Sequence, residues 1–252
     1  MIFYLISITI TGFVCYVYGM ACLKLLKNLF KEDGTNISMP IVLLLGMFLV
    51  SSIFTLYSFV LPLNASAFSV AILVSFLLFF LLINDLSTLF IVTYDQLLHK
   101  HLRYRFLGIT LLLFVLVVGQ YPPLNGDTGY YHAQTIRWLE EFGTVTGLGN
   151  LFIGYAHNNS WFILESLFSQ PWLIGSPLHV MNGLMFIVMF YVCLSGADEI
   201  TRKKLSFSSL LKLTVLPFYV LYISQNIASL SPDLPASIIV VITLIYIVEL
   251  LE

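Results

Sequence analysis

Seven long runs of apolar residues dominate this chain of 252 residues. A helix needs about 20 consecutive apolar residues to cross the hydrocarbon core of a bilayer. In a helix every backbone polar group is satisfied within its own segment, which the bilayer interior demands. The sequence therefore predicts an all-α fold, a polytopic transmembrane helix bundle of about seven spans. The runs lie at residues 2–23, 40–61, 67–92, 106–121, 178–195, 210–224 and 236–251.

The composition excludes whole classes of protein. Hydrophobic residues make up 59% of the chain and charged residues 10%, against roughly 45–50% and about 25% in soluble domains. The mean hydropathy is +0.96. A soluble enzyme, a nucleic-acid-binding protein and a disordered protein are excluded, because a globule this apolar would expose a large oily surface. Cys15, Cys22 and Cys193 fall inside apolar runs, so we interpret them as buried apolar residues.

The placement of basic residues predicts the orientation. With seven spans, ten of the eleven lysines and arginines fall on one side of the membrane, and Arg137 alone falls on the other. Basic residues favour the cytoplasmic side, so we expect the N-terminus outside and the C-terminus inside. The ten are Lys24, Lys27, Lys31, Lys100, Arg103, Arg105, Arg202, Lys203, Lys204 and Lys212.

The same count bears on residues 161–175, which are apolar enough to suggest an eighth span. A crossing there would move Arg202, Lys203 and Lys204 to the outside, and the segment also carries Glu165. We therefore expect a helix that lies along the outer interface.

One long loop, residues 121–177, is expected on the outer face. A loop of this length in a helical bundle is usually functional. Within it, residues 131–142 place apolar and polar side chains on opposite arcs, which is typical of an amphipathic helix at a membrane surface. Tyr131 is a candidate substrate contact or an aromatic interface anchor. Arg137 is a candidate phosphate contact, or the partner of Glu141 four residues on.

Asp127 stands at the start of this loop, where the fourth span has just ended. A carboxylate there faces the headgroup region and is suited to binding a metal or to taking a proton from an acceptor hydroxyl. The structural alternative is a turn or helix-capping acid after Asn125-Gly126. His132, five residues on, is a candidate phosphate or metal ligand, or a histidine that is simply hydrogen-bonded at the interface.

Asp233 opens the seventh span after a short outer loop. Ser231-Pro232-Asp233 is also ordinary helix-start chemistry. Even so, Asp127 and Asp233 are expected on the same face at similar depth, and two such acids can share one substrate or one divalent cation. The sequence thus offers a catalytic Asp127, substrate contacts at Tyr131, His132, Arg137 and Asp233, and a metal site at the two aspartates.

The order of these features resembles the GT-C superfamily of membrane glycosyltransferases, which includes the protein O-mannosyltransferases and the bacterial aminoarabinose transferases. Three stretches carry the likeness: Asp127-Thr-Gly-Tyr-Tyr-His132 through Trp138 to Gly143, then Gly147-Leu-Gly-Asn-Leu151, then Asn159-Ser-Trp-Phe162. They look most like an uncharacterised bacterial branch. The resemblance covers roughly residues 106–252, a GT-C-like module that follows three N-terminal transmembrane helices in residues 1–105.

The resemblance implies a function. Asp127 matches the essential acid of the first outer loop in that superfamily, and Asp233 matches a second acid at a helix start. Family enzymes use polyprenyl-phosphate-linked sugars, and many need a divalent metal. The expected partners are the lipid bilayer and a lipid-linked sugar donor, with no nucleic acid. The expected location is the bacterial inner membrane, in the assembly of cell-envelope glycans or glycolipids.

The likeness also has two departures. Three helices precede the acid loop here, and four follow from residue 106 where the family core has about seven. We therefore expect the chain to be the N-terminal part of a longer protein. A non-enzymatic membrane protein remains the alternative, as a transporter, a flippase or a component of polysaccharide assembly.

Overall fold

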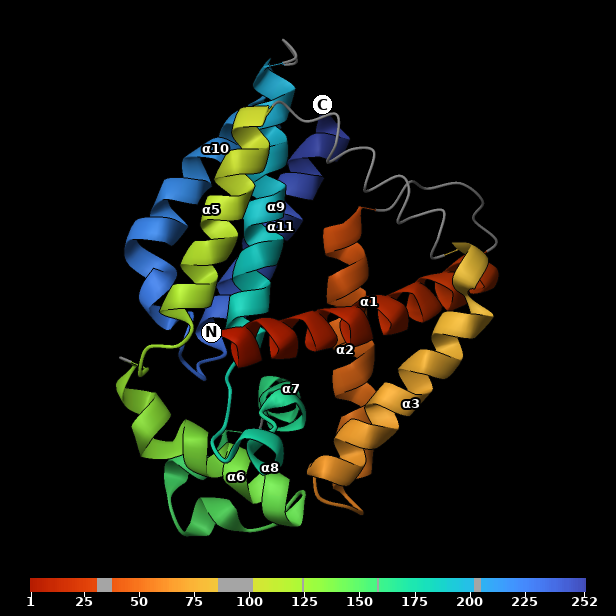
Figure 1. The fold of residues 1–252 in the computed structure, drawn as a ribbon, viewed down its shortest axis with the longest axis vertical. Helices are drawn as coiled ribbons and strands as arrows, with labels where there is room; N and C mark the ends of the chain where they lie inside the picture. Colours follow the sequence, from red (N-terminus) through yellow and green to blue (C-terminus); the bar gives the residue numbers. More distant parts are fainter. Residues whose placement is uncertain (31–37, 86–101, 124, 158, 202–204) are drawn as a thin grey trace.

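The computed structural model describes most of the chain, and every regular element in the described part is a helix (Figure 1). The remaining positions, which include residues 86–92 of the third predicted run, lie outside the described residues. The described residues are 1–30, 38–85, 102–123, 125–157, 159–201 and 205–252.

Four of the helices are long and apolar enough to cross a membrane. They are α1 (Ile2–Phe30), α2 (Met39–Ser58), α9 (Met181–Thr201) and α11 (Asp233–Leu251). The other three predicted runs also contain apolar helices, but these are shorter. They are α3 (Ala65–Leu81), α5 (Leu102–Val118) and α10 (Phe207–Phe218). The described part of the chain is thus all-α, and four of its helices are candidates to span a membrane.

Helices α5, α9, α10 and α11 lie side by side, and α9 packs against each of the other three (Figure 1). Figure 1 shows α1 crossing α2 at a steep angle. The crossing is close because glycines face each other there: a Cβ atom on Gly19 would collide with the carbonyl group of Val42, and one on Gly46 with the carbonyl group of Cys15.

The long loop folds at one end of the bundle, where α5 ends and α9 and α11 begin (Figure 1). It contains a π-helical turn, η1 (Thr128–His132), which continues directly into α6 (Ala133–Phe142). Two short 3-10 turns follow at Leu148–Asn150 and Ile153–Ala156. Then come α7 (Ser160–Phe168) and α8 (Pro171–Ile174).

Backbone hydrogen bonds attach this loop to the N-terminal helices. The amide of Leu63 donates to the carbonyl oxygen of Leu139 at 2.8 Å, and the amide of Thr144 donates to that of Ser58 at 2.7 Å. Gly143 ends α6 with φ +74°, a value that suits glycine because it has no side chain. The segment is therefore held in place against the end of α2.

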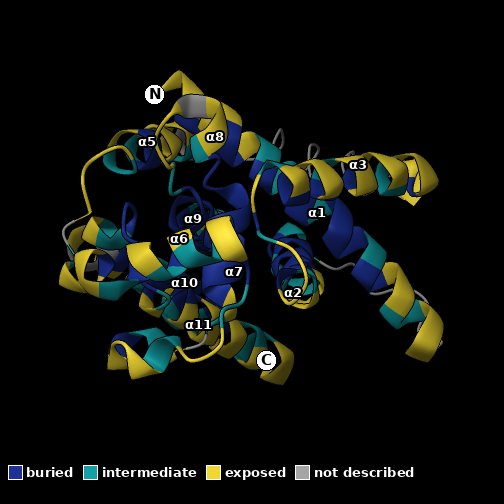
Figure 2. Cartoon of the chain, turned by 90° about the horizontal axis from the view of Figure 1, so that it is seen from below, coloured by how far each residue is buried: buried dark blue, intermediate teal, exposed yellow. Residues whose placement is uncertain are grey.

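The expectation for residues 161–175 needs correction. They form two helices rather than one, and every residue of α7 from Trp161 to Phe168 is buried. Figure 2, seen from below, shows α6 with exposed residues outward and α7 dark blue beside it. Helix α7 is covered by α6 on one side and by α2, α3 and α9 elsewhere, so it does not lie at an interface. Of these two helices, α6 is the one with the amphipathic character expected of an interface helix.

Candidate functional site

Asp127 lies directly before η1 with its side chain exposed. Its own amide donates to Oδ1 of Asn125 at 2.9 Å, so Asn125 forms the turn. The Asp127 carboxylate makes no capping hydrogen bond to the helix. Helix capping, the structural alternative for this acid, therefore does not account for its side chain. The π-helical turn that follows is a type of distortion often found at functional sites.

Asp233 is the first residue of α11 and is also exposed. Ser231 Oγ donates to Asp233 Oδ2 at 2.9 Å, and the amide of Asp233 donates back to Ser231 Oγ at 3.2 Å. These two bonds fix the carboxylate beside the helix start. The exposed carboxylate lies at the end of the bundle where α11 begins.

The two aspartates act on the same pair of side chains. Burial raises the pKa of the Tyr131 phenol, and the negative charges of Asp127 and Asp233 raise it further. Burial also lowers the pKa of His132, while the same two carboxylates oppose that shift. Asp127 and Asp233 come from loops far apart in the sequence, yet the charge of each acts to raise the pKa of both Tyr131 and His132. The fold thus gathers four of the five predicted site residues.

His132 is held among aromatic rings. Its side chain is buried, and its Nδ1 atom has no hydrogen-bond partner among the described residues. The ring centroid lies 4.3 Å from that of Tyr131 and 5.2 Å from that of Phe162. The exposed His157 approaches the other side of Tyr131, at 5.9 Å between centroids. A neutral imidazole in this setting can serve as a hydrogen-bond donor or acceptor.

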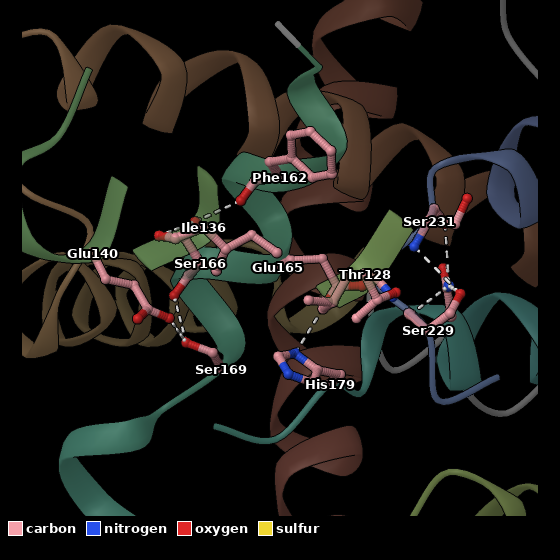
Figure 3. Close-up of polar contacts among 12 residues, drawn as sticks. Thr128, Ile136, Glu140, Phe162, Glu165, Ser166, Ser169, His179, Ser229 and Ser231 are labelled. Atoms are coloured by element: carbon pink, nitrogen blue, oxygen red, sulfur yellow. Dashed lines mark hydrogen bonds and ion pairs between the residues drawn. The ribbon is translucent and has the colours of Figure 1, made fainter. Parts of the chain in front are cut away.

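Contacts between the two loops keep this arrangement together. The amide of Leu230 donates to Thr128 Oγ1 at 3.4 Å, so the first turn of η1 touches the loop before Asp233. Figure 3 shows Thr128 beside Ser229 and Ser231 of that loop. Leu230 also packs with Ile136 and Phe162 in a small buried cluster.

Arg137 lies apart from this group. Its Nε atom contacts Glu141 Oε1 at 2.7 Å, and the guanidinium is largely exposed. Arg137 follows His132 by five residues, so its side chain lies on a different side of the helix from that of His132. The pairing with Glu141 is the structural alternative that the sequence allowed, and a phosphate contact by Arg137 remains a prediction.

The two aspartates are the hard oxygen ligands that a magnesium-like cation prefers. In the described part of the chain, no group of three or more His, Cys, Asp or Glu side chains is placed to hold a metal. Mg²⁺ commonly binds through one or two carboxylates and keeps waters or substrate phosphates as its other ligands. A divalent cation at Asp127 and Asp233 stays a prediction.

Sequence reasoning missed two buried polar residues and one half-buried histidine near the same end of the bundle. Glu165 on α7 and His179 before α9 face each other, with Nδ1 to Oε2 at 3.7 Å (Figure 3). Asn182 on α9 holds the loop that carries Asp233. An acid inside the apolar segment 161–168 was the available signal for Glu165, since unpaired charge is costly to bury.

The comparisons identify a family. The protein-family model described as Domain of unknown function (DUF8201) matches residues 1–252, so the chain belongs to that family. No curated protein and no solved structure matches the chain. The chemistry of the site described above therefore carries the functional argument.

Proposed function

We propose that this protein is a membrane glycosyltransferase of the GT-C type, which transfers a sugar from a polyprenyl-phosphate donor at the outer face of the membrane. One observation supports this above the others. Two exposed carboxylates from separate loops, Asp127 and Asp233, each act to raise the pKa of the same Tyr131 and His132. Exposed acids beside hydrogen-bond donors, at one end of an apolar bundle, suit an acceptor hydroxyl and a sugar phosphate.

The proposed topology has seven spans with the N-terminus outside. All seven predicted runs contain apolar helices, three of them shorter than a usual span. Asp127 and Asp233 then lie at the outer end, in a bacterial inner membrane whose envelope glycans or glycolipids are the products. This placement brings the carboxylates to the depth of the phosphate of a lipid-linked sugar.

In the proposed reaction, Asp127 takes the proton of the acceptor hydroxyl as its oxygen bonds to the anomeric carbon of the sugar. The bond from that carbon to the lipid phosphate breaks, and the phosphate leaves with the polyprenyl chain. The raised pKa of Tyr131 keeps the phenol protonated, so it can donate to a phosphate or sugar oxygen. His132 contributes a second donor, and Asp233 supports the acceptor.

A divalent cation bound by Asp127 and Asp233 would neutralise charge on the leaving phosphate. The residues of this chain would still have to orient the donor and exclude water from it. Phe162 packs against His132 and, in a buried cluster, against Leu230. These apolar side chains would help to exclude water from the donor.

The test is Asp127→Asn in the whole protein, assayed in membrane vesicles with polyprenyl-phosphate sugars. Loss of a general base typically costs about 10²–10⁴-fold in rate, and we expect a loss in that range with normal expression. Glu141→Gln is the matched control, because Glu141 is another exposed carboxylate of the same segment that pairs with Arg137. Transfer by Asp127→Asn at the wild-type rate would reject Asp127 as the catalytic base, and no transfer by the wild-type protein would favour the non-enzymatic alternative.

A further inference from the structure

A second group of polar atoms lies deeper, behind the candidate site. Five side-chain atoms there are buried and have no hydrogen-bond partner among the described residues. Such atoms are rare in folded proteins and each needs an explanation. They are Tyr4 Oη on α1, Trp161 Nε1 and both carboxylate oxygens of Glu165 on α7, and His179 Nδ1 in the segment before α9.

These atoms belong to one neighbourhood centred on Glu165. Its side chain is 1% exposed, and Oε2 lies 3.7 Å from Nδ1 of His179, which is 18% exposed. That separation is too long for a hydrogen bond but short enough for strong electrostatic coupling. The charge of Glu165 also acts on the Tyr4 hydroxyl. The Trp161 indole interacts with the carboxylate from α7 itself.

A second carboxylate interacts with His179 through its charge. Glu140 on α6 is half-buried, accepts a hydrogen bond from Ser169 Oγ, and feels the charge of His179. Glu141 and Arg137 act on Glu140 in opposite directions, and both are exposed. His179 is therefore coupled electrostatically to a half-buried carboxylate on α6 as well as to the fully buried one on α7, and Figure 3 shows the three side chains.

We propose that Glu165 is a proton-binding site, which exchanges its proton with the outer solution through His179 and Glu140. A lone ionised carboxylate in an apolar interior is costly, and binding a proton removes the cost. Chains of Glu and His side chains inside membrane proteins commonly carry protons. The proposal does not rest on sugar transfer, because none of its residues is part of the Asp127 and Asp233 group.

The proton balance is simple. Protonated His179 gives the proton on Nδ1 to Oε2 of Glu165, which leaves a neutral imidazole and a neutral carboxylic acid. His179 then regains a proton from Glu140, and Glu140 regains one from water outside. Burial raises the pKa of Glu165, and His179 and Trp161 only partly offset that effect. Burial raises the pKa of Glu140 as well, which suits a group that must carry a proton in transit.

Infrared spectroscopy of the whole protein in lipid nanodiscs tests the proposal. The wild-type protein should show a buried carboxylic-acid band that persists well above the ordinary Glu pKa of 4.5 in a titration from about pH 4 to about pH 9. Glu165→Gln should remove this band, and Glu141→Gln should leave it intact. A wild-type band that disappears at or below the ordinary Glu pKa, or one that survives in Glu165→Gln, would overturn the site.

The exchange path has its own readout. When the nanodiscs are moved into D₂O, the band of the wild-type protein should shift as the carboxyl proton is replaced. His179→Gln should slow that shift at least tenfold, and Glu140→Gln should slow it less. Exchange as fast in His179→Gln as in the wild-type protein would reject the path. Wild-type and His179→Gln measurements keep the proposal testable if Glu165→Gln does not fold.

Discussion

The Nδ2 atom of Asn182 donates a 2.8 Å hydrogen bond to the carbonyl oxygen of Ser229, which ties the start of α9 to the loop before α11. The same nitrogen also lies 3.1 Å from the carbonyl oxygen of Asn226 and 3.2 Å from that of Ser231. Asn182 is fully buried. One amide group therefore contacts three carbonyl oxygens of the loop that leads to Asp233.

Replacing Asn182 by alanine should loosen this loop. The change leaves buried carbonyl oxygens without a donor, at a cost of about 1–3 kcal/mol in the free energy of unfolding. Under the proposed function it should also lower the rate of sugar transfer, because Asp233 loses its fixed position. Thermal unfolding in detergent and the transfer assay measure the two effects.

Ser229→Ala is the control for Asn182→Ala, because it leaves the bonds from Asn182 to the carbonyl oxygens in place. It removes the Ser229 Oγ atom, which accepts from Asn182 and from the amide of Ser231, each at 3.3 Å, and donates to the carbonyl oxygen of Asn226 at 3.0 Å. We expect a smaller loss of stability from it. Equal losses in the two variants would contradict the view that the carbonyl bonds of Asn182 organise the loop.

The crossing of α1 and α2 gives a second prediction. Gly46→Ala should destabilise the protein by at least about 1–3 kcal/mol, the typical cost of overpacking, because the new methyl group collides with the backbone at Cys15. Gly129→Ala is the matched control, because a Cβ at Gly129 meets nothing within 4 Å. Comparable unfolding temperatures for the two variants would show that the helices do not cross as closely as described.

The helices could be predicted from sequence because their cause is local. A run of about 20 apolar residues is sufficient to predict a membrane helix. The alternation of such runs also led to the expectation that Asp127 and Asp233 lie on the same face, which stays a prediction. The pair of Glu165 and His179 could not be predicted in the same way. It depends on α7 folding back under α6 against α9, a contact that hydrophobic periodicity does not encode. The burial of α7 on all sides escaped prediction for the same reason.

His132 should give stability a pH dependence of known sign. Burial lowers its pKa below the ordinary value of 6.5, so the unfolded chain binds a proton more tightly than the folded protein does. Its contribution is fully present above pH 6.5 and is lost as the pH falls through the folded pKa. His132→Phe keeps a ring against Tyr131 and Phe162 and should flatten the loss of stability on acidification.

The comparison for His132→Phe is His157→Phe, which changes an exposed histidine of the same site. Unfolding temperatures are measured for both variants and the wild-type protein from about pH 7.5 down to about pH 5. His132→Phe should alter the slope more than His157→Phe, because the charge of His157 is only the smallest of the causes that set the pKa of His132. A wild-type slope that His132→Phe leaves unchanged would show that His132 is not buried in its neutral form.

Arg137 offers a way to separate a structural role from a phosphate contact. Its ion pair with Glu141 is exposed, and exposed pairs of this kind contribute little to stability. Arg137→Ala and Glu141→Ala break the same pair, so both should lower the free energy of unfolding by a similarly small amount. Only Arg137→Ala removes a cation from the outer surface of α6. If Arg137 contacts the donor phosphate, the KM for the lipid-linked sugar should rise about tenfold in that variant, equivalent to about 1.4 kcal/mol. An unchanged KM in both variants would leave Arg137 with the ion pair as its whole role and would remove it from the candidate site.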